Sequence, residues 1–308
     1  MITYQRLNER PRLFLALTGL TPVEFRHLLP AFERAYMELY PVRLTLQGQP
    51  RHRAAGAGRH SRLGSSADKL LFLLVYLKTY PLQAVLGELF GLSTTRANYW
   101  LQRLLPVLQR ALDRLGVLPD RDRQRGACQA RRTRESRKLI IDATERRRQR
   151  PKKPEKQALH YSGKKKTHTD KNVLVVNASS QRVLYLGTTH AGSVHEKKIV
   201  DQEPIAFPAD VTLYKDAGFQ GYEPPVARAC QAKKKTKRHP LTDREKCINR
   251  KLAQIRVRVE HAVAGVKRSR IVKDTFRNTK ENMSDAAVEV ACGLHNIRLD
   301  HRKHGLKL

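Results

Sequence analysis

Three carboxylates stand out in this chain of 308 residues because their surroundings are otherwise apolar or basic. Asp142 and Asp216 each follow a short apolar run, which predicts that both stand at the ends of strands. Glu260 lies inside a long helical pattern. Two carboxylates about 4 Å apart repel each other by about 1 kcal/mol in water-like surroundings, and by about 4 kcal/mol at an effective dielectric constant of 20. A cluster of the three would therefore require a divalent cation.

The side-chain chemistry indicates which cation this would be. Carboxylate oxygens are hard ligands, and the chain has no histidine or cysteine spacing that is typical of a zinc site. The four cysteines lie far apart, which is typical of reduced thiols. We therefore expect Mg²⁺ or Mn²⁺, with two ions per active site. Two such ions would activate the attacking oxygen and stabilise the departing oxygen at a phosphodiester.

The helical pattern around Glu260 leaves two interpretations open. Arg256, Glu260 and Lys267 are separated by four and seven residues, so they share one stripe of the helix, which Asn249 extends. The apolar residues of the segment occupy another side. One interpretation is a metal ligand flanked by groups that hold phosphate. The other is an ordinary salt bridge on a solvated face.

The charge of the chain favours a polyanionic partner. Lys and Arg number 61 against 28 Asp and Glu, which gives a formal net charge of +33. Residues 121–170 and 231–280 carry +12 and +13 of that charge. Nucleic acid is the natural partner, because each neutralised phosphate releases a condensed counterion. A solvated basic surface without a nucleic-acid partner is the alternative.

Residues 67–115 predict three helices, of which the last two have the geometry of a helix-turn-helix. A short helix over 82–90 ends at Gly91, and Ser93 caps a third helix with one apolar stripe. The N-terminus of that helix would enter the major groove, although any compact three-helix bundle could show the same pattern. The residues expected to contact DNA are Thr94, Thr95, Arg96, Asn98, Tyr99, Gln102 and Arg103.

After Pro119 the pattern changes from helical to extended. Strands are expected over 138–142, 172–177, 182–188 and 211–215, with helices over 193–202 and 242–270. Three strands, a helix, a strand and a final helix match the order of a ribonuclease H-like fold. The expected domains are an N-terminal helical segment with a basic linker (1–66), a helix-turn-helix domain (67–118), a linker (119–137) and a catalytic domain with C-terminal helices (138–308).

Several motifs occur in a fixed order and together point to one family. They are Asp142-Ala-Thr-Glu145 followed by Arg150-Pro151, Tyr161-Ser-Gly-Lys-Lys-Lys-Thr-His168, Gly192-Ser-Val-His195, Lys215-Asp-Ala-Gly-Phe-Gln-Gly-Tyr222, Arg256-x₃-Glu260-x₆-Lys267 and Leu294-His-Asn-Ile-Arg298. Over about residues 67–300 the chain resembles the bacterial DDE transposases of insertion sequence family 5, which are related to the eukaryotic Harbinger group.

The resemblance implies an α/β fold, in which an all-α helix-turn-helix domain precedes a ribonuclease H-like catalytic domain with a mixed sheet flanked by helices. Asp142, Asp216 and Glu260 become the catalytic, metal-binding triad. Arg256 and Lys267 become DNA-positioning residues. Apart from the resemblance, Lys164, Lys165 and Lys166 are expected either to follow the DNA backbone near the active site or to form a flexible charged turn. His195 and Glu196 form either an auxiliary acid–base or metal pair, or a purely structural one.

The function implied is DNA transposition. The enzyme would bind the terminal inverted repeats of its element, hydrolyse phosphodiesters there and join the freed 3′-hydroxyls to target DNA. Its partners would be double-stranded DNA and further copies of itself, as a homodimer or a higher oligomer, in a cytoplasmic, nucleoid-associated location without membrane contact. Two alternatives stay open: a non-catalytic DNA-binding protein derived from a transposase, and a hydrolytic nuclease of the same fold.

Overall fold

The structure is a computed structural model that describes residues 1–41, 49–50, 61–125, 137–235, 240–280 and 282–305. Much of the basic linker expected within 1–66, and part of the linker expected at 119–137, lie outside the described residues. The chain divides into two compact units. The first comprises Met1–Leu118, Arg268–Val272 and Ala286–Leu308, and the second comprises Pro119–Lys267 and Lys273–Asp285.

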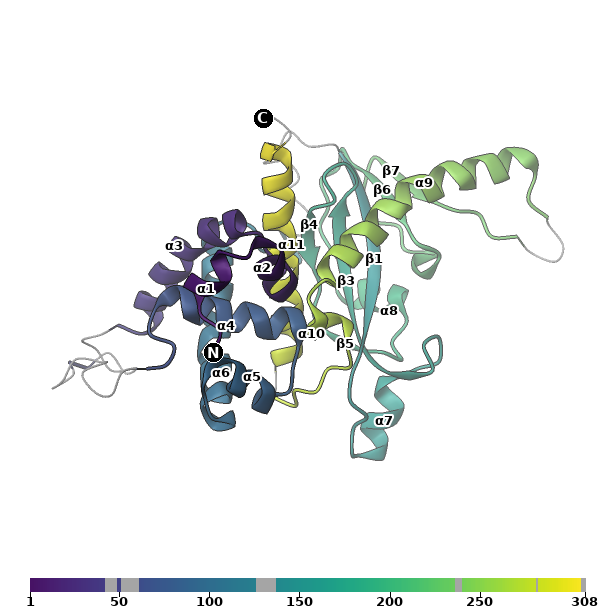
Figure 1. Cartoon of the computed structure of the whole chain (residues 1–308). Helices are drawn as coiled ribbons and strands as arrows, with labels where there is room; N and C mark the ends of the chain where they lie inside the picture. Colours follow the sequence, from purple (N-terminus) through teal and green to yellow (C-terminus); the bar gives the residue numbers. More distant parts are fainter. Residues whose placement is uncertain (42–48, 51–60, 126–136, 236–239, 281, 306–308) are drawn as a thin grey trace. The chain divides into compact units, whose positions relative to one another are not determined.

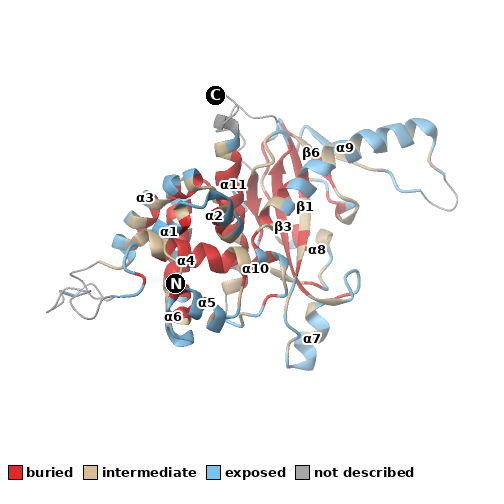
Figure 2. Ribbon diagram, in the orientation of Figure 1, coloured by how far each residue is buried: buried red, intermediate tan, exposed pale blue. Residues whose placement is uncertain are grey.

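The first unit is helical. Its helices are α1 (Tyr4–Asn8), α2 (Pro11–Thr18), α3 (Pro22–Leu39), α4 (Ser66–Thr79), α5 (Gln83–Phe90), α6 (Thr94–Arg114), α10 (Arg270–Lys273) and most of α11 (Met283–Gly305) (Figure 1). A capping box of Thr21 and Glu24 begins α3. Residues 70–77 of α4 are apolar throughout and all buried, which makes α4 the central helix of this unit (Figure 2).

The C-terminal helix α11 packs with the helices of this unit from Ala286 onward. Asn296 of α11 donates a hydrogen bond to the Val117 carbonyl (2.8 Å), and Gln109 of α6 donates one to Glu289 of α11 (2.7 Å). Arg298 reaches the Gly19 carbonyl (3.3 Å). The apolar face of α11 is buried, so the helix is part of the core of this unit. The contacts also place Met1–Leu118 in this same compact unit.

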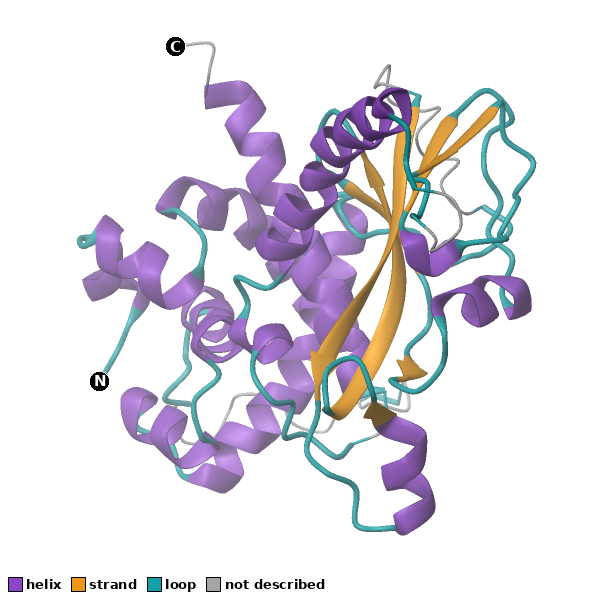
Figure 3. Cartoon of the chain, turned by 90° about the vertical axis from the view of Figure 1, so that its right-hand side faces the viewer, coloured by secondary structure: helices purple, strands orange, loops and turns teal. Residues whose placement is uncertain are grey.

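The second unit is built on a mixed sheet (Figures 1 and 3). Its strands are β1 (Lys138–Arg147), β2 (Tyr161–Ser162), β3 (Thr167–Asn177), β4 (Val183–Leu186), β5 (His190–Ala191), β6 (Thr212–Lys215) and β7 (Arg228–Gln231). Its helices are α7 (Pro154–His160), α8 (Glu196–Gln202), α9 (Asp243–Val266) and the 3₁₀ turn η2 (Ala217–Phe219). The main strand order is β2-β3-β1-β6-β7, in which β1 pairs antiparallel with β3 and parallel with β6. This arrangement confirms the expected ribonuclease H-like α/β architecture.

Two local predictions for this unit differ from the structure. Asp142 lies in the middle of β1, not at its end, because the strand continues to Arg147 as the partner of the long strand β3. Helix α8 begins at Glu196, with His195 as its N-cap, three residues later than expected. The strands expected over 172–177 and 182–188 are present in β3 and β4, which pair antiparallel, and the strand that precedes Asp216 is confirmed.

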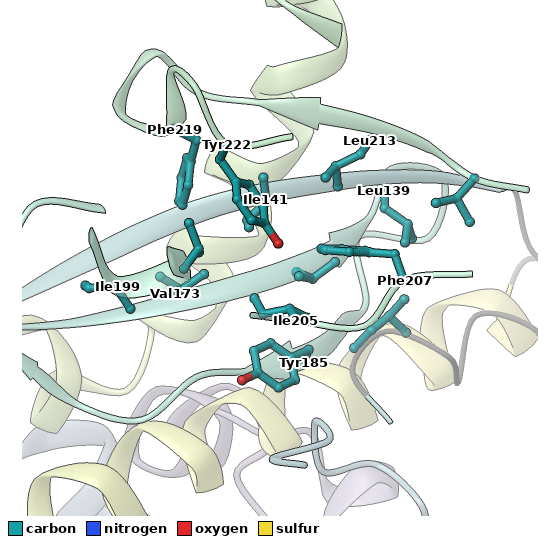
Figure 4. Packing of buried hydrophobic residues seen from close by; sticks show 14 residues of the cluster. Leu139, Ile141, Val173, Tyr185, Ile199, Ile205, Phe207, Leu213, Phe219 and Tyr222 are labelled. Carbon is teal, nitrogen blue, oxygen red and sulfur yellow. The ribbon is translucent and has the colours of Figure 1, made fainter. Parts of the chain in front are cut away.

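Alternation along β1 separates the core of this unit from the face that carries Asp142. Leu139 and Ile141 point into an apolar cluster with Ile199 of α8 and with Phe219 (Figure 4). Asp142 has the opposite parity, so its side chain lies on the other face of the sheet. Among the described residues, no helix combines the length and apolar composition needed to cross a membrane.

Candidate active site and DNA-binding helices

The first two predicted carboxylates come from neighbouring strands of the sheet. Strands β1 and β6 run parallel, and Ile141 pairs with Lys215 in their register. Asp142 and Asp216 are the next residues along the two strands, so the ladder places them side by side. Asp142 is half-buried and accepts a hydrogen bond from the backbone N–H of Ala143 (2.8 Å). The sheet thus brings two acids together that are 74 residues apart in the sequence.

Burial and the neighbouring carboxylate make Asp142 a weaker acid than an ordinary aspartate side chain. Removal from water raises the pKa of Asp142 from 3.8 to about 6, and the negative charge of Asp216 contributes in the same direction. The cations Arg256 and Lys164 act against this rise without cancelling it. Two acids that repel each other in this way form a site that a further positive charge would stabilise.

Helix α9 brings two predicted cations to this site. The Arg256 guanidinium forms an ion pair with Asp216 (Nη2 to Oδ1, 2.5 Å). Lys267, at the other end of the stripe, donates to the backbone carbonyl of Glu145 (3.4 Å), and the charge of Asp142 also acts on it. Burial lowers the pKa of Lys267. Arg256 and Lys267 therefore lie close to the two carboxylates, Arg256 beside Asp216 and Lys267 near Asp142.

Glu260 is not brought into the same cluster. It lies one helical turn after Arg256, but its side chain is exposed. Within the described part of the chain, no group of three or more His, Cys, Asp or Glu side chains is close enough to hold a metal ion. Asn249, which extended the stripe in the sequence, instead bonds the backbone of Lys233 (3.0 and 2.9 Å). The structure thus joins two of the three predicted ligands.

A pocket of about 590 Å³ borders Asp216 and contains an ion cluster that the sequence analysis missed. The Lys171 ammonium is buried between Glu145 (3.4 Å) and Glu196 (3.3 Å), and it donates to the Val194 carbonyl (2.8 Å). Burial alone would raise the pKa of Glu196, but its own backbone N–H and Lys171 outweigh burial and lower it. The available signal for this cluster was Lys171, two residues before the apolar run 173–176 of β3.

Of the three predicted lysines, one borders the same pocket. Lys164 lines it, and its charge lowers the pKa of both Asp142 and Glu196. Lys165 lies close enough to lower the pKa of Lys267, and Lys166 adopts a left-handed backbone conformation (φ 50°) in the turn before β3.

His195 is exposed, and its Nδ1 accepts the backbone N–H of Lys197 (3.3 Å) as the N-cap of α8. This cap gives His195 a structural role. Glu196 pairs with Lys171 instead of forming a close pair with His195, whose Nε2 is 4.0 Å away. The contacts therefore favour the structural interpretation of these two residues.

The raised pKa of Asp142 predicts how stability depends on pH in the absence of divalent metal. In the unfolded chain the carboxyl ionises near pH 4, whereas in the folded chain it ionises at about 6. Ionisation of Asp142 therefore destabilises the folded state. The free energy of unfolding is higher below pH 4, and this extra stability is lost as the pH rises through 6. In EDTA, Asp142→Asn should exceed the wild type in unfolding free energy by about 3 kcal/mol at pH 7.5. Urea titrations at pH 4 and 7.5 should show the difference only at the higher pH.

In the helical unit, α5 and α6 form a helix-turn-helix with a tight turn. Gly91 ends α5 in the left-handed conformation (φ 66°), and the Leu92 N–H bonds the Gly87 carbonyl (2.8 Å). The Ser93 side chain then accepts the Arg96 N–H (3.3 Å) and caps α6. The predicted turn and cap are therefore both present.

The predicted DNA-contacting residues of α6 separate into exposed and packed side chains. Thr94, Thr95, Arg96, Tyr99 and Gln102 are exposed, and Asn98 is half-buried.

Arg103 differs from the exposed group, because its guanidinium stacks on the ring of Tyr40 (3.4 Å to the centroid) and lies near the rings of Tyr36 and Tyr99. Arg103 thus packs α6 against α3, and this contact accounts for its side chain without any DNA.

This packing predicts opposite effects for two arginines of α6. Arg103→Ala should lower the unfolding free energy by about 1–2 kcal/mol through the lost stacking on Tyr40, with little change in base preference. Arg96→Ala should leave stability unchanged and weaken binding to the preferred sequence more than to unrelated DNA. Thermal unfolding and competition binding on both variants check this; equal losses on both kinds of DNA for Arg96→Ala would remove it from base readout.

Comparison with known proteins finds one family match that includes the two carboxylates and another that covers the helix-turn-helix. Residues 141–296 match the family described as DDE superfamily endonuclease, and residues 61–113 match the helix-turn-helix of DDE superfamily endonuclease. A probable transposase for insertion sequence element IS702 from Microchaete diplosiphon is 28% identical over 161 residues. That match covers 52% of this chain and 57% of the relative. No solved structure matches the chain at a significant level. The first matched range contains Asp142, Asp216 and Glu260.

Proposed function

The chain belongs to the family of DDE superfamily endonucleases, and from this membership we propose that it is a DNA transposase of the family 5 and Harbinger-like group. It binds the terminal inverted repeats of its element, hydrolyses phosphodiesters at the ends and joins the freed 3′-hydroxyls to target DNA. The observation that carries this proposal is the pair Asp142 and Asp216, which adjacent parallel strands hold side by side under the cations of α9.

The residues present fit a divalent cation of the magnesium type. Two carboxylates share the site, and the charge of one raises the pKa of the other, so a cation between them would relieve their repulsion. Asp142 and Asp216 would hold the ions, with Glu260 as the third ligand from α9. Two Mg²⁺ or Mn²⁺ ions supply activation of the attacking oxygen and stabilisation of the departing oxygen when they are bound.

The cations of the site have their own role toward DNA. Arg256 pairs with Asp216 through one terminal nitrogen, and its side chain stays 27% exposed. A guanidinium has more N–H donors than one ion pair uses, so Arg256 can also donate to a phosphate oxygen. Lys267 and Lys164 add positive charge near Asp142. Together these side chains can hold a DNA backbone over the two carboxylates.

The outer half of α9 offers further contact with the DNA backbone. None of the residues 243–258 is buried (Figure 2). The basic residues of this exposed segment, apart from Arg256, are Arg244, Lys246, Arg250, Lys251 and Arg258. Such a surface binds DNA through phosphates, without regard to sequence. Sequence recognition then comes from the exposed residues of α6. Two ends of one element must be held together for transposition, so the proposal includes a homodimer or a larger assembly.

One observation favours a second candidate function. The described residues contain no three-acid group, and the side chain of Glu260 is exposed. A DNA-binding protein that has lost catalysis would have this appearance.

A cleavage assay separates the candidate functions. Duplexes that the purified chain selects from a randomised pool are placed in a supercoiled plasmid and incubated with Mg²⁺, with Mn²⁺ or with EDTA. A transposase cuts in the presence of either metal and joins 3′ ends to a second duplex. Binding without cutting in either metal would support the non-catalytic protein, and cutting without joining would support a hydrolytic nuclease.

A further inference from the structure

Three amide side chains form a hydrogen-bonded relay across the helix-turn-helix. Gln102 Nε2 donates to Asn98 Oδ1 (2.7 Å), and Asn98 Nδ2 donates to Gln83 Oε1 (2.9 Å). Asn98 and Gln102 are one turn apart on α6, whereas Gln83 is the first residue of α5. The relay therefore ties the two helices together through side chains that lie at or near the surface.

The relay has a direction, and this direction orients the amide of Asn98. Its nitrogen faces Gln83 and its oxygen faces Gln102. An amide that is free to turn about its last bond can exchange its donor and acceptor, and it then distinguishes bases poorly. A base-reading amide must present each group to a fixed place, because the major groove is read as a pattern of donors and acceptors. Gln83 supplies the acceptor that holds Asn98 in one orientation.

The end of the relay at Gln83 suits an anion. The side-chain oxygen of Gln83 accepts the hydrogen bond from Asn98. The side-chain amino group of Gln83 therefore points away from that bond and carries two N–H donors. Among the residues that the structure describes, none bonds this amino group. Phosphate oxygens only accept hydrogen bonds, and glutamine side chains are common phosphate ligands in DNA complexes. A phosphate at this point would also stabilise the observed direction of the relay, because each bond in a chain polarises the next.

We propose that Gln83 is a specificity-determining positioning residue, which binds a DNA phosphate through its amino group and thereby orients Asn98 and Gln102 toward the bases. This inference rests on the proposed DNA-binding function of the helix-turn-helix. The exposed and charged side chains alone would assign DNA recognition entirely to α6. This inference gives α5 a part in recognition as well. The role has two parts: Gln83 binds a phosphate through its side-chain N–H donors, and it orients Asn98 through its side-chain oxygen. The two parts can therefore be tested separately.

Two substitutions separate these halves. Gln83→Leu removes both donor and acceptor, whereas Gln83→Glu keeps an oxygen that accepts from Asn98 but replaces the donors with a negative charge. The full-length wild type and both variants are used to select duplexes from a randomised pool, and affinities are measured on the wild-type selection. We expect Gln83→Leu to bind about tenfold more weakly and to lose about tenfold in discrimination at one or two adjacent base pairs. Gln83→Glu should bind more weakly to every sequence but keep the wild-type preference.

Gln5→Leu on the exposed face of α1 is the matched control, and it should change neither affinity nor preference. Thermal unfolding shows whether each variant is folded. Unchanged preference in Gln83→Leu would overturn the inference, and so would an equal loss of preference in both Gln83 variants. A wild type that enriches no sequence would instead overturn the proposed function together with this inference, so the two failures are distinguishable.

Discussion

Asp142→Asn should abolish DNA cleavage, with a rate at least about a thousandfold below the wild type, while DNA binding is retained. The substitution removes a charged oxygen ligand and leaves the side-chain volume unchanged. A thousandfold loss corresponds to about 4 kcal/mol of transition-state stabilisation, which is within the range expected for a catalytic metal ion. Cleavage of a plasmid that carries the selected duplex, in Mg²⁺ and in Mn²⁺, measures the effect, and a gel-shift titration measures binding.

A matched substitution in the same unit controls for the change of residue type. Asp210→Asn removes a carboxylate that pairs with Arg137 at the surface (3.1 Å), so cleavage should stay close to the wild-type rate. If Asp142→Asn retained a tenth or more of the wild-type rate, Asp142 could not be a metal ligand. If binding fell in parallel with cleavage, the substitution would have acted on the DNA complex and not on the chemical step.

Gly87→Ala should unfold or distort the helix-turn-helix and eliminate sequence-specific DNA binding. A Cβ at this position would lie 2.4 Å from the Leu92 carbonyl oxygen, which is backbone and cannot turn aside. The turn that follows Gly91 would have to open, at a cost of about 3 kcal/mol in unfolding free energy. Affinity for the selected duplex should fall by at least about a hundredfold, because the position of α6 depends on this turn.

Gly64→Ala is the control for this prediction. Its Cβ would meet only the Ser61 carbonyl oxygen at 3.7 Å, an ordinary contact, so stability and binding should both be retained. Urea unfolding and competition binding with unrelated DNA report the two effects separately. Wild-type stability and specificity in Gly87→Ala would show that the turn tolerates a side chain and that the backbone contact is wrong.

The amino-acid sequence was sufficient for features that depend on neighbouring residues. The cap at Ser93 was predicted and is present, and Thr21 and Thr242 cap α3 and α9 in the same way. Such a cap can be predicted because it joins residues three positions apart. The helix-turn-helix followed from periodicity and from Gly91, and the mixed fold from the order of strands and helices. The pair of Arg256 and Lys267 on one stripe of α9 also followed, since helical spacing places them there.

Features that depend on residues distant in the sequence were decided only by the tertiary structure. Asp142 was expected at a strand end, yet β3 extends β1 by five residues beyond it. The ion pair of Arg256 with Asp216 and the buried ammonium of Lys171 arise from packing between separate elements. Glu260 has the predicted spacing without the predicted cluster.

The same reason explains the other differences. Arg103 lies on the polar side of α6, but its guanidinium packs on the ring of Tyr40, the residue that follows α3. The sequence of α6 alone does not indicate this contact. The assignment of α11 to the helical unit and the link between Gln83 and Asn98 likewise join distant segments. Propensity and periodicity act over one or two helical turns, whereas the choice of partner for each face is a property of the whole folded chain.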